Sequence, residues 1–219
     1  MIADKTQTKK ENWDHFWQRN AQSRFTQKSW SKIRIMRLLD QELNPGMNVL
    51  DAGCGSGFFS QYFISRGGKV YTLDYSQEAL DIARRLTQNR SQAYLKENLL
   101  ESSFGEKYSE MFDLIFTDGL FEHFSETDQA RIMYNFKKAK KKSGLVATFV
   151  PNRYSWWEII RPMVMPGIHE IPFTPEKLFR LHEGMQIVKK GGINVLPFAF
   201  SPDEAWGARL GMLLYCFAR

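Results

Sequence analysis

The sequence predicts an α/β fold with a doubly wound, mostly parallel sheet. Strand-like and helix-like patterns alternate along residues 47–150, which is typical of a parallel sheet whose strands are connected by helices. The run Leu145–Val150 is continuously apolar, as expected of a central parallel strand that is buried on both faces. A glycine-rich turn at 53–57 joins the first strand to a helix, which is typical of nucleotide-binding sheets. With 219 residues in the chain, one such domain is expected.

Residues 1–44 are predicted to form a basic arm followed by cap helices. The arm is polar and lacks periodicity, so no regular structure is expected at its start. Trp13, Phe16 and Trp17 then share one helical face, which either closes over a bound ligand or docks a helix onto the core. An amphipathic helix over 33–43 follows and ends at a Pro-Gly pair.

Residues 45–219 are predicted to form the main domain. Its strands are expected at 47–52, 69–74, 93–95, from 112, 145–150, from 186 and at 210–217, and its helices at 57–66, 76–89, from 125 and from 174. Lysines 137–142 are expected in the last turns of the helix that begins at 125, with Ser143-Gly144 ending it. An insert at 151–173, interrupted by four prolines, follows the fifth strand.

The glycine-rich turn favours a cationic ligand over a dinucleotide. Glycine occupies positions 53, 55 and 57, but the dinucleotide fingerprint requires its third glycine at the position that Phe58 holds. Asp51 would direct a carboxylate towards the place of a pyrophosphate, where like charges repel. A P-loop is excluded because no Gly-Lys-Ser/Thr follows.

A second acidic residue stands at the end of the next strand. Asp74 lies 21 residues after Gly53, close to the offset at which such folds place a carboxylate on ribose hydroxyls. Its alternative role is that of a helix N-cap or a loop acid. Tyr75 follows it directly and is either a ligand contact or an ordinary surface residue.

The segment Asp51-Ala52-Gly53-Cys54-Gly55-Ser56-Gly57 resembles the first motif of class I S-adenosylmethionine-dependent methyltransferases. The resemblance implies a Rossmann-like sheet of seven strands, one of them antiparallel. It also implies S-adenosylmethionine as cofactor and S-adenosylhomocysteine as product. The implied cofactor-binding residues in this part of the chain are Asp51, Gly53, Cys54, Gly55, Gly57, Asp74, Tyr75 (against adenine) and Asn98. Asn98 stands where the family usually has an Asp, and its amide oxygen can still accept a hydrogen bond from the adenine amino group.

The segment 112–124 resembles the fourth motif of small-molecule methyltransferases of the ubiquinone/menaquinone-biosynthesis type. The resemblance implies that Thr117 and Asp118 line the methionine end of the cofactor and that the Glu122-His123 pair lies near the reacting methyl group. His123 is therefore the first candidate for a general base, and His169 in the insert is the second. The chain lacks the Asn/Asp-Pro-Pro-Tyr/Phe signature and the Pro-Cys nucleophile of nucleic-acid methyltransferases.

The insert lies where family members build a substrate lid. Trp156, Trp157 and Met163 within it predict a sizeable apolar or aromatic acceptor. Core packing, a dimer interface and contact with a membrane surface are alternative explanations of the same residues. A monomer and a homodimer are both compatible with the sequence.

The net charge of +6 belongs to the N-terminal arm. Residues 1–37 contain nine Lys and Arg against three acids, whereas the remainder is balanced. This arm is either a solvated tail or the contact surface of an RNA methyltransferase. A catalytically silent S-adenosylmethionine-binding protein and a NAD-dependent oxidoreductase are further alternatives, and Asp51 argues against the last.

The remaining composition predicts a cytoplasmic protein without a metal site. Cys54 and Cys216 are the only cysteines, and neither has neighbours at metal-ligand spacing. No apolar run is long enough to span a bilayer, and no signal-peptide pattern opens the chain.

Overall fold

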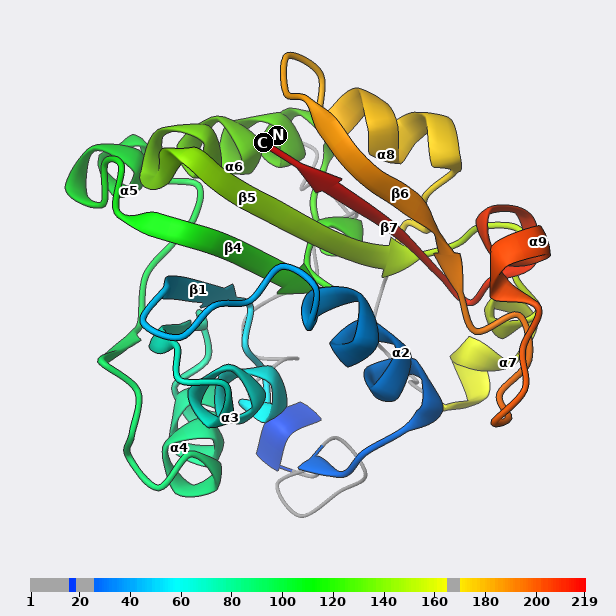
Figure 1. Ribbon diagram of the computed structural model, residues 1–219, viewed down its shortest axis with the longest axis horizontal. Coiled ribbons are helices and arrows are strands. Elements are labelled where there is room, and N and C mark those ends of the chain that lie inside the picture. The colour runs from blue at the N-terminus through cyan, green and yellow to red at the C-terminus, as the bar shows by residue number, and fades with distance from the viewer. Residues whose placement is uncertain (1–15, 19–25, 165–169) are drawn as a thin grey trace, which may run out of the picture.

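The protein folds around one seven-stranded sheet with strand order β3-β2-β1-β4-β5-β7-β6 (Figure 1). The structure, a computed structural model, describes residues 16–18, 26–164 and 170–219. Strands β1 to β5 pair in parallel, and β7 pairs antiparallel with both β5 and β6. The predicted doubly wound, mostly parallel sheet is confirmed. Within the described part of the chain, no helix is long and apolar enough to cross a membrane.

The strands lie close to their predicted positions. They are β1 (Asn48–Ala52), β2 (Lys69–Leu73), β3 (Ala93–Leu95), β4 (Phe112–Asp118), β5 (Lys140–Pro151), β6 (Ile187–Ile193) and β7 (Leu213–Ala218). Strands β1, β4, β5 and β7 are buried along most of their length, because helices cover the sheet on both faces.

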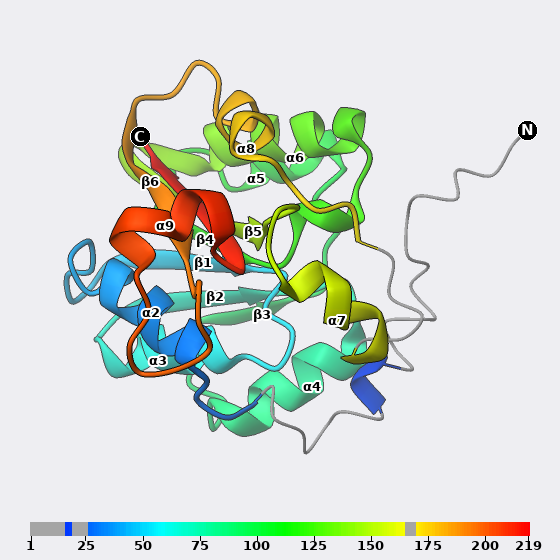
Figure 2. The same cartoon turned by 90° about the vertical axis from the view of Figure 1, so that its right-hand side faces the viewer.

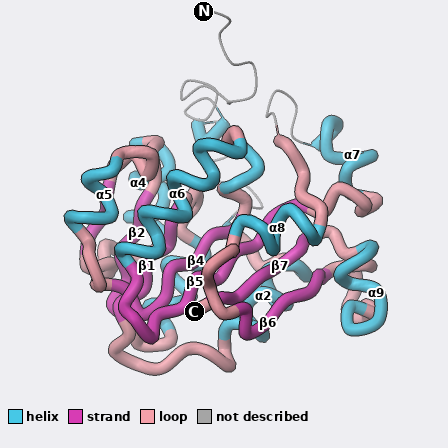
Figure 3. Tube along the Cα trace, turned by 90° about the horizontal axis from the view of Figure 1, so that it is seen from above, coloured by secondary structure: helices cyan, strands magenta, loops and turns pink. Residues whose placement is uncertain are grey.

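The helices form two layers. They are α2 (Trp30–Leu39), α3 (Phe58–Ser65), α4 (Gln77–Leu86), α5 (Ser102–Lys107), α6 (Glu126–Ala139), α7 (Trp157–Val164), α8 (Pro175–Leu181) and α9 (Asp203–Leu210). Helices α5, α6 and α8 lie on one side of the sheet, and α2, α3 and α4 lie on the other (Figures 1 and 2). Seen from above, α7 and α9 lie at the same end of the molecule (Figure 3). Two hydrophobic clusters fill the spaces between the layers.

Three helix starts follow the capping rules that the sequence suggests. The hydroxyls of Ser76, Ser125 and Thr174 each accept a hydrogen bond from the backbone N–H three residues later. Pro175 occupies the first turn of α8, where its missing N–H costs nothing. These local signals place the helices that follow β2, β4 and the insert.

The lysine-rich segment is divided between two elements: Lys137 and Lys138 lie in the last turn of α6, as predicted, whereas residues 140–142 belong to β5 and the prediction for them was wrong. Helix α6 ends at Ala139, and Lys140 already pairs with Phe112 in the β4–β5 ladder. The Nζ of Lys141 lies 2.8 Å from an Asp113 carboxylate oxygen. Strand pairing and this ion pair outweigh the helical pattern that the lysines extend.

The C-terminal strand also begins later in the chain than predicted. It begins at Leu213 rather than at 210, because residues 203–210 form α9. Helix α2 likewise ends at Leu39, several residues before the Pro-Gly pair that the sequence suggested as its end.

Candidate active site

A cavity of about 860 Å³ opens at the carboxyl ends of β1, β2 and β4. The strand order reverses between β1 and β4, since β2 continues on one side of β1 and β5 on the far side of β4. Such a switch point leaves a crevice outside the strand ends, because the two connecting helices go to opposite faces of the sheet. The cavity therefore lies where this fold type binds its ligands.

The glycine-rich turn forms one wall of the cavity. Gly53, Gly55 and Gly57 have φ values of +74°, +51° and +77°, a region that side chains other than hydrogen rarely allow. A Cβ atom on Gly55 would lie 2.6 Å from Trp17 Cζ2, so the indole of Trp17 packs directly on the turn. Trp17 also lines the cavity, and it packs against Ala79 of α4. Trp17, from the aromatic face predicted at 13–17, thus packs against α4 and also lines the cavity. Trp13 lies outside the described residues.

Asp74 organises the turn from the neighbouring strand. One of its carboxylate oxygens accepts a hydrogen bond from the Gly55 N–H at 2.9 Å, and the other accepts from the Ser76 N–H at 2.9 Å. Asp74 lines the cavity, as does the half-exposed Tyr75 beside it. The carboxylate is held in one orientation at the cavity wall.

Two further carboxyl groups lie at the carboxyl ends of β1 and β4. Asp51 is only 2% exposed and accepts a hydrogen bond from the Ser60 hydroxyl at 2.6 Å. Burial raises the pKa of Asp51 to about 7, and the nearby Asp118 and Asp74 add to the rise. Burial likewise raises the pKa of Asp118 to about 6, although the Lys32 ammonium opposes the rise. A cationic ligand in the cavity would favour the ionised carboxylates and so oppose the rise in these two pKa values.

Other predicted cofactor residues differ in their access to the cavity. Asn98 lines it, but its amide oxygen already accepts the Leu100 N–H at 3.0 Å. Cys54 lines it with a buried thiol, whose pKa burial raises well above its usual value. Thr117 is fully buried within β4 and is absent from the cavity wall, whereas its neighbour Asp118 reaches it. Successive residues of a strand point to opposite faces, which separates these two side chains.

The cavity wall also includes acidic and aromatic side chains that follow β4 or come from the insert. His123 and Glu122, both in the 3-10 turn η2 (Phe121–His123), line it together with Phe124 and Trp157. In the described part of the chain, Glu122, His123 and Glu170 are the one trio of His, Cys, Asp or Glu with ligand atoms all within 4.8 Å of one another, close enough to share a cation. His169 lies outside the described residues.

Two residues of this wall were missed by the sequence reasoning. Lys32 on α2 lines the cavity with its Nζ 4.1 Å from the Phe58 ring centroid. Burial lowers the pKa of Lys32 to about 8, while the Asp118 carboxylate opposes the fall. Glu170 comes from the end of the insert. No spacing signal links either residue to the motifs, because they approach the cavity only through tertiary packing.

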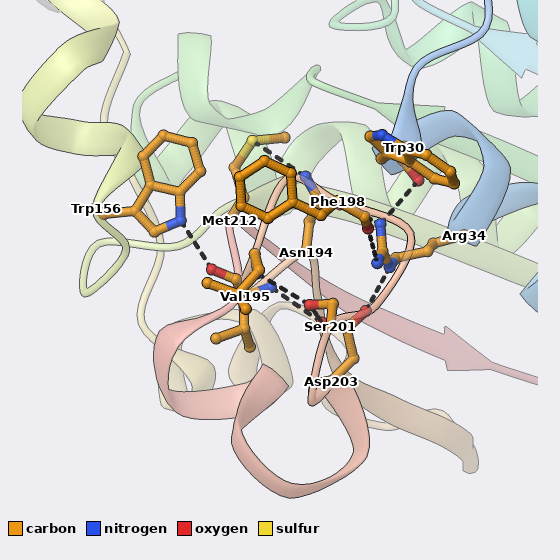
Figure 4. Close-up of polar contacts among 10 residues, drawn as sticks. Trp30, Arg34, Trp156, Asn194, Val195, Phe198, Ser201, Asp203 and Met212 are labelled. Carbon is orange, nitrogen blue, oxygen red and sulfur yellow. Dashed lines mark hydrogen bonds and ion pairs between the residues drawn. The ribbon is translucent and has the colours of Figure 1, made fainter.

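A polar network anchors the two segments that carry Lys32 and Trp157 (Figure 4). Arg34 on α2 is ion-paired with Asp203 at 2.7 Å and donates to the Asn194 side chain and the Phe198 carbonyl, each also at 2.7 Å. From the insert, the Trp156 indole N–H donates to the Val195 carbonyl at 2.9 Å. Helix α2 and the start of the insert are thereby fastened to the same segment between β6 and α9.

Comparison with known proteins agrees with this location. A family model described as a methyltransferase domain matches residues 49–144, which include β1 to β4 and the glycine-rich turn. The chain is 32% identical over 120 residues to a probable cobalt-precorrin-6B C(15)-methyltransferase of Thermoplasma acidophilum, covering 50% of this chain and 58% of that protein. It is 30% identical over 135 residues to the ubiquinone biosynthesis O-methyltransferase of Photorhabdus laumondii, covering 57% and 55%. The chain thus spans a little over half the length of these relatives.

The fold is shared over nearly the whole chain. The crystal structure of the N-methyltransferase NodS from Bradyrhizobium japonicum, in complex with S-adenosylhomocysteine, superimposes with a TM-score of 0.69 at 16% identity, covering 95% of this chain and 98% of that one. A SAM-dependent methyltransferase from Archaeoglobus fulgidus gives a TM-score of 0.66 at 16% identity, covering 85% and 93%.

Proposed function

We propose that this chain is a class I S-adenosylmethionine-dependent methyltransferase that transfers a methyl group to a small-molecule acceptor. The observation that carries the proposal is the glycine-rich turn of the matched segment, held by the Asp74 carboxylate at the edge of a large cavity. The acceptor is proposed to be apolar or aromatic over much of its surface, because Trp157, Phe124 and Leu120 line the cavity beyond the turn.

The residues around the turn fit S-adenosylmethionine. When bound, this cofactor supplies a methyl group already activated on a sulfonium. It carries a second positive charge on its ammonium group. Burial raises the pKa values of Asp51 and Asp118, and a positive charge beside them would favour their ionised forms. Asp74 is proposed to hold the ribose hydroxyls and Tyr75 and Asn98 the adenine, with Gly53, Cys54, Gly55 and Gly57 providing the backbone surface.

The chain's own part in the reaction is alignment and the exclusion of water. Trp17 covers the turn from the N-terminal side, and the insert covers the opposite end through Trp157. A hydroxyl acceptor also needs a group that takes its proton, and His123, which is 6% exposed on the cavity wall, is the first candidate. His169 is kept as the second candidate.

Calorimetric titration tests the cofactor assignment. S-adenosylmethionine and S-adenosylhomocysteine are expected to bind the protein, and Asp74→Ala is expected to weaken both by more than about tenfold because the turn loses its anchor. Asp81→Ala is the matched control, since the Asp81 side chain is 48% exposed on α4, where it accepts from Gln77 and pairs with Arg84. Binding of NAD in place of these two compounds would contradict the proposal.

Replacement of His123 tests the catalytic assignment once an acceptor is known. His123→Ala is expected to slow turnover while S-adenosylhomocysteine affinity stays within about twofold, because His123 lies at the acceptor end of the cavity. Unchanged turnover would remove His123 from the mechanism. Activity on RNA that is lost when the basic arm is deleted would instead support the RNA methyltransferase.

A further inference from the structure

The acceptor end of the cavity contains a buried carboxyl pair that the proposed reaction does not use. Glu122 is 3% exposed, and its Oε2 atom is fully buried without a hydrogen-bond partner among the residues that the structure describes. Glu170 approaches it from the end of the insert, within 4.8 Å between their ligand atoms. A backbone hydrogen bond holds the two segments together, because the Ile171 N–H donates to the Glu122 carbonyl at 2.8 Å.

Within the described ranges, Arg161 is the one Lys or Arg with an ion pair to either carboxyl group of this pair. The guanidinium of Arg161 lies 3.4 Å from Glu170 but is shared with Glu158, also at 3.4 Å. Burial first, and then the Glu170 carboxyl, raise the pKa of Glu122 well above its usual range. A buried carboxyl oxygen without a hydrogen-bond partner costs free energy, so the position of Glu122 Oε2 on a cavity wall points to a ligand that donates to it.

We propose that the methyl acceptor carries a basic amine whose ammonium group binds between Glu122 and Glu170. An ammonium is a compact charge with several N–H donors, which suits carboxylate oxygens that converge from two segments. Trp157 and Phe124 line the same cavity, and aromatic rings of this kind can bind a cation. The inference rests on the proposed function and names the substrate class of that same site.

A monovalent organic cation suits the pair better than a divalent metal ion. The Arg161 guanidinium lies 3.4 Å from a Glu170 oxygen and takes up part of that carboxylate. A divalent ion needs several carboxylate oxygens as direct ligands, whereas an ammonium needs only hydrogen-bond acceptors. An ammonium adds one charge and leaves room for the apolar remainder of the acceptor in the cavity of about 860 Å³.

Matched ligand pairs test the inference by binding alone. The full chain, saturated with S-adenosylhomocysteine, is titrated calorimetrically with benzylamine, phenethylamine and tryptamine and with the corresponding alcohols. At least one amine is expected to bind at least about tenfold more tightly than its alcohol. Glu122→Gln keeps the shape of the side chain and should abolish that preference while alcohol affinity is unchanged. Glu126→Gln is the matched control, because Glu126 is exposed on α6.

Three results would overturn the inference. They are equal affinity of every amine and its alcohol, an amine preference that survives in Glu122→Gln, and binding of Mg²⁺ or Mn²⁺ that Glu122→Gln removes. Titration with S-adenosylhomocysteine alone separates the two proposals. If it binds and the amines show no preference, only the acceptor class is wrong, whereas loss of its binding contradicts the proposed function itself.

Discussion

Replacing Arg34 by Met is expected to destabilise the fold by about 3 kcal/mol. Arg34 is 8% exposed and holds Asp203, Asn194 and Phe198 through three contacts of 2.7 Å (Figure 4). Removal of one partner of a buried ion pair costs about 3–5 kcal/mol, because the other charge stays buried and unpaired. The Asp203 side chain is 17% exposed and can recover some hydration, which favours the lower value.

Equilibrium urea unfolding followed by circular dichroism measures this loss. With a slope of about 2–3 kcal/mol per molar urea, the midpoint should fall by about 1 M. Arg131→Met is the matched control. The Arg131 side chain is 53% exposed and its Asp128 partner is 3.8 Å away, so a loss of about 0–1 kcal/mol is expected.

A second variant separates the unpaired charge from the lost packing. Asp203→Asn in the Arg34→Met background removes the unpaired charge and should restore part of the lost stability. Equal midpoints for Arg34→Met and Arg131→Met would refute the reasoning, because they would show that water reaches Asp203 freely.

Three further predictions concern the turn, a buried histidine and the aromatic cover. Gly57→Ala should lower the unfolding free energy by more than Gly46→Ala, because both have positive φ but only the Cβ at Gly57 would meet Ala83, at 2.6 Å; equal losses in urea unfolding would contradict this. His182 is buried neutral with its pKa lowered to about 4, so its contribution to stability is present above pH 6.5 and is lost as pH falls towards 4. His182→Gln should flatten the pH dependence of the urea midpoint over that range, and an unaltered profile would disprove it. Trp17→Ala should cost more free energy of S-adenosylhomocysteine binding, measured by calorimetry, than free energy of unfolding, measured in urea. Unchanged affinity would show that Trp17 serves only to pack its segment against α4.

The sequence was sufficient for the strands, most helices and the glycine-rich turn with Asp51 and Asp74, where we propose that the cofactor binds. Asp51 and the glycines of the turn are contiguous, so a single strand–turn–helix unit places them together wherever it occurs. Asp74 is separated from Gly53 by one helix and one strand, a length that parallel pairing of β1 and β2 returns to the same sheet edge. Local periodicity and short-range pairing decide these positions, and both are legible in the chain.

The part of the cavity where we propose that the acceptor binds depends on contacts between residues far apart in the chain, which residue spacing does not predict. Glu170 reaches Glu122 through the backbone bond of Ile171, 49 residues further along the chain. Lys32 interacts electrostatically with Asp118 because α2 packs in the same hydrophobic cluster as residues of β4. The exclusion of Thr117 from the cavity follows from the pleat of β4, whose phase depends on its neighbours.

The sequence by itself therefore determined the sheet, the glycine-rich turn and the acids around it, because these arise from periodicity and from residues joined by one βαβ unit. The tertiary structure alone decided which side chains close the cavity and where uncompensated charge is buried. Burial and electrostatics depend on every element that surrounds a group, including elements far away in the chain, so they exist only once the chain has packed.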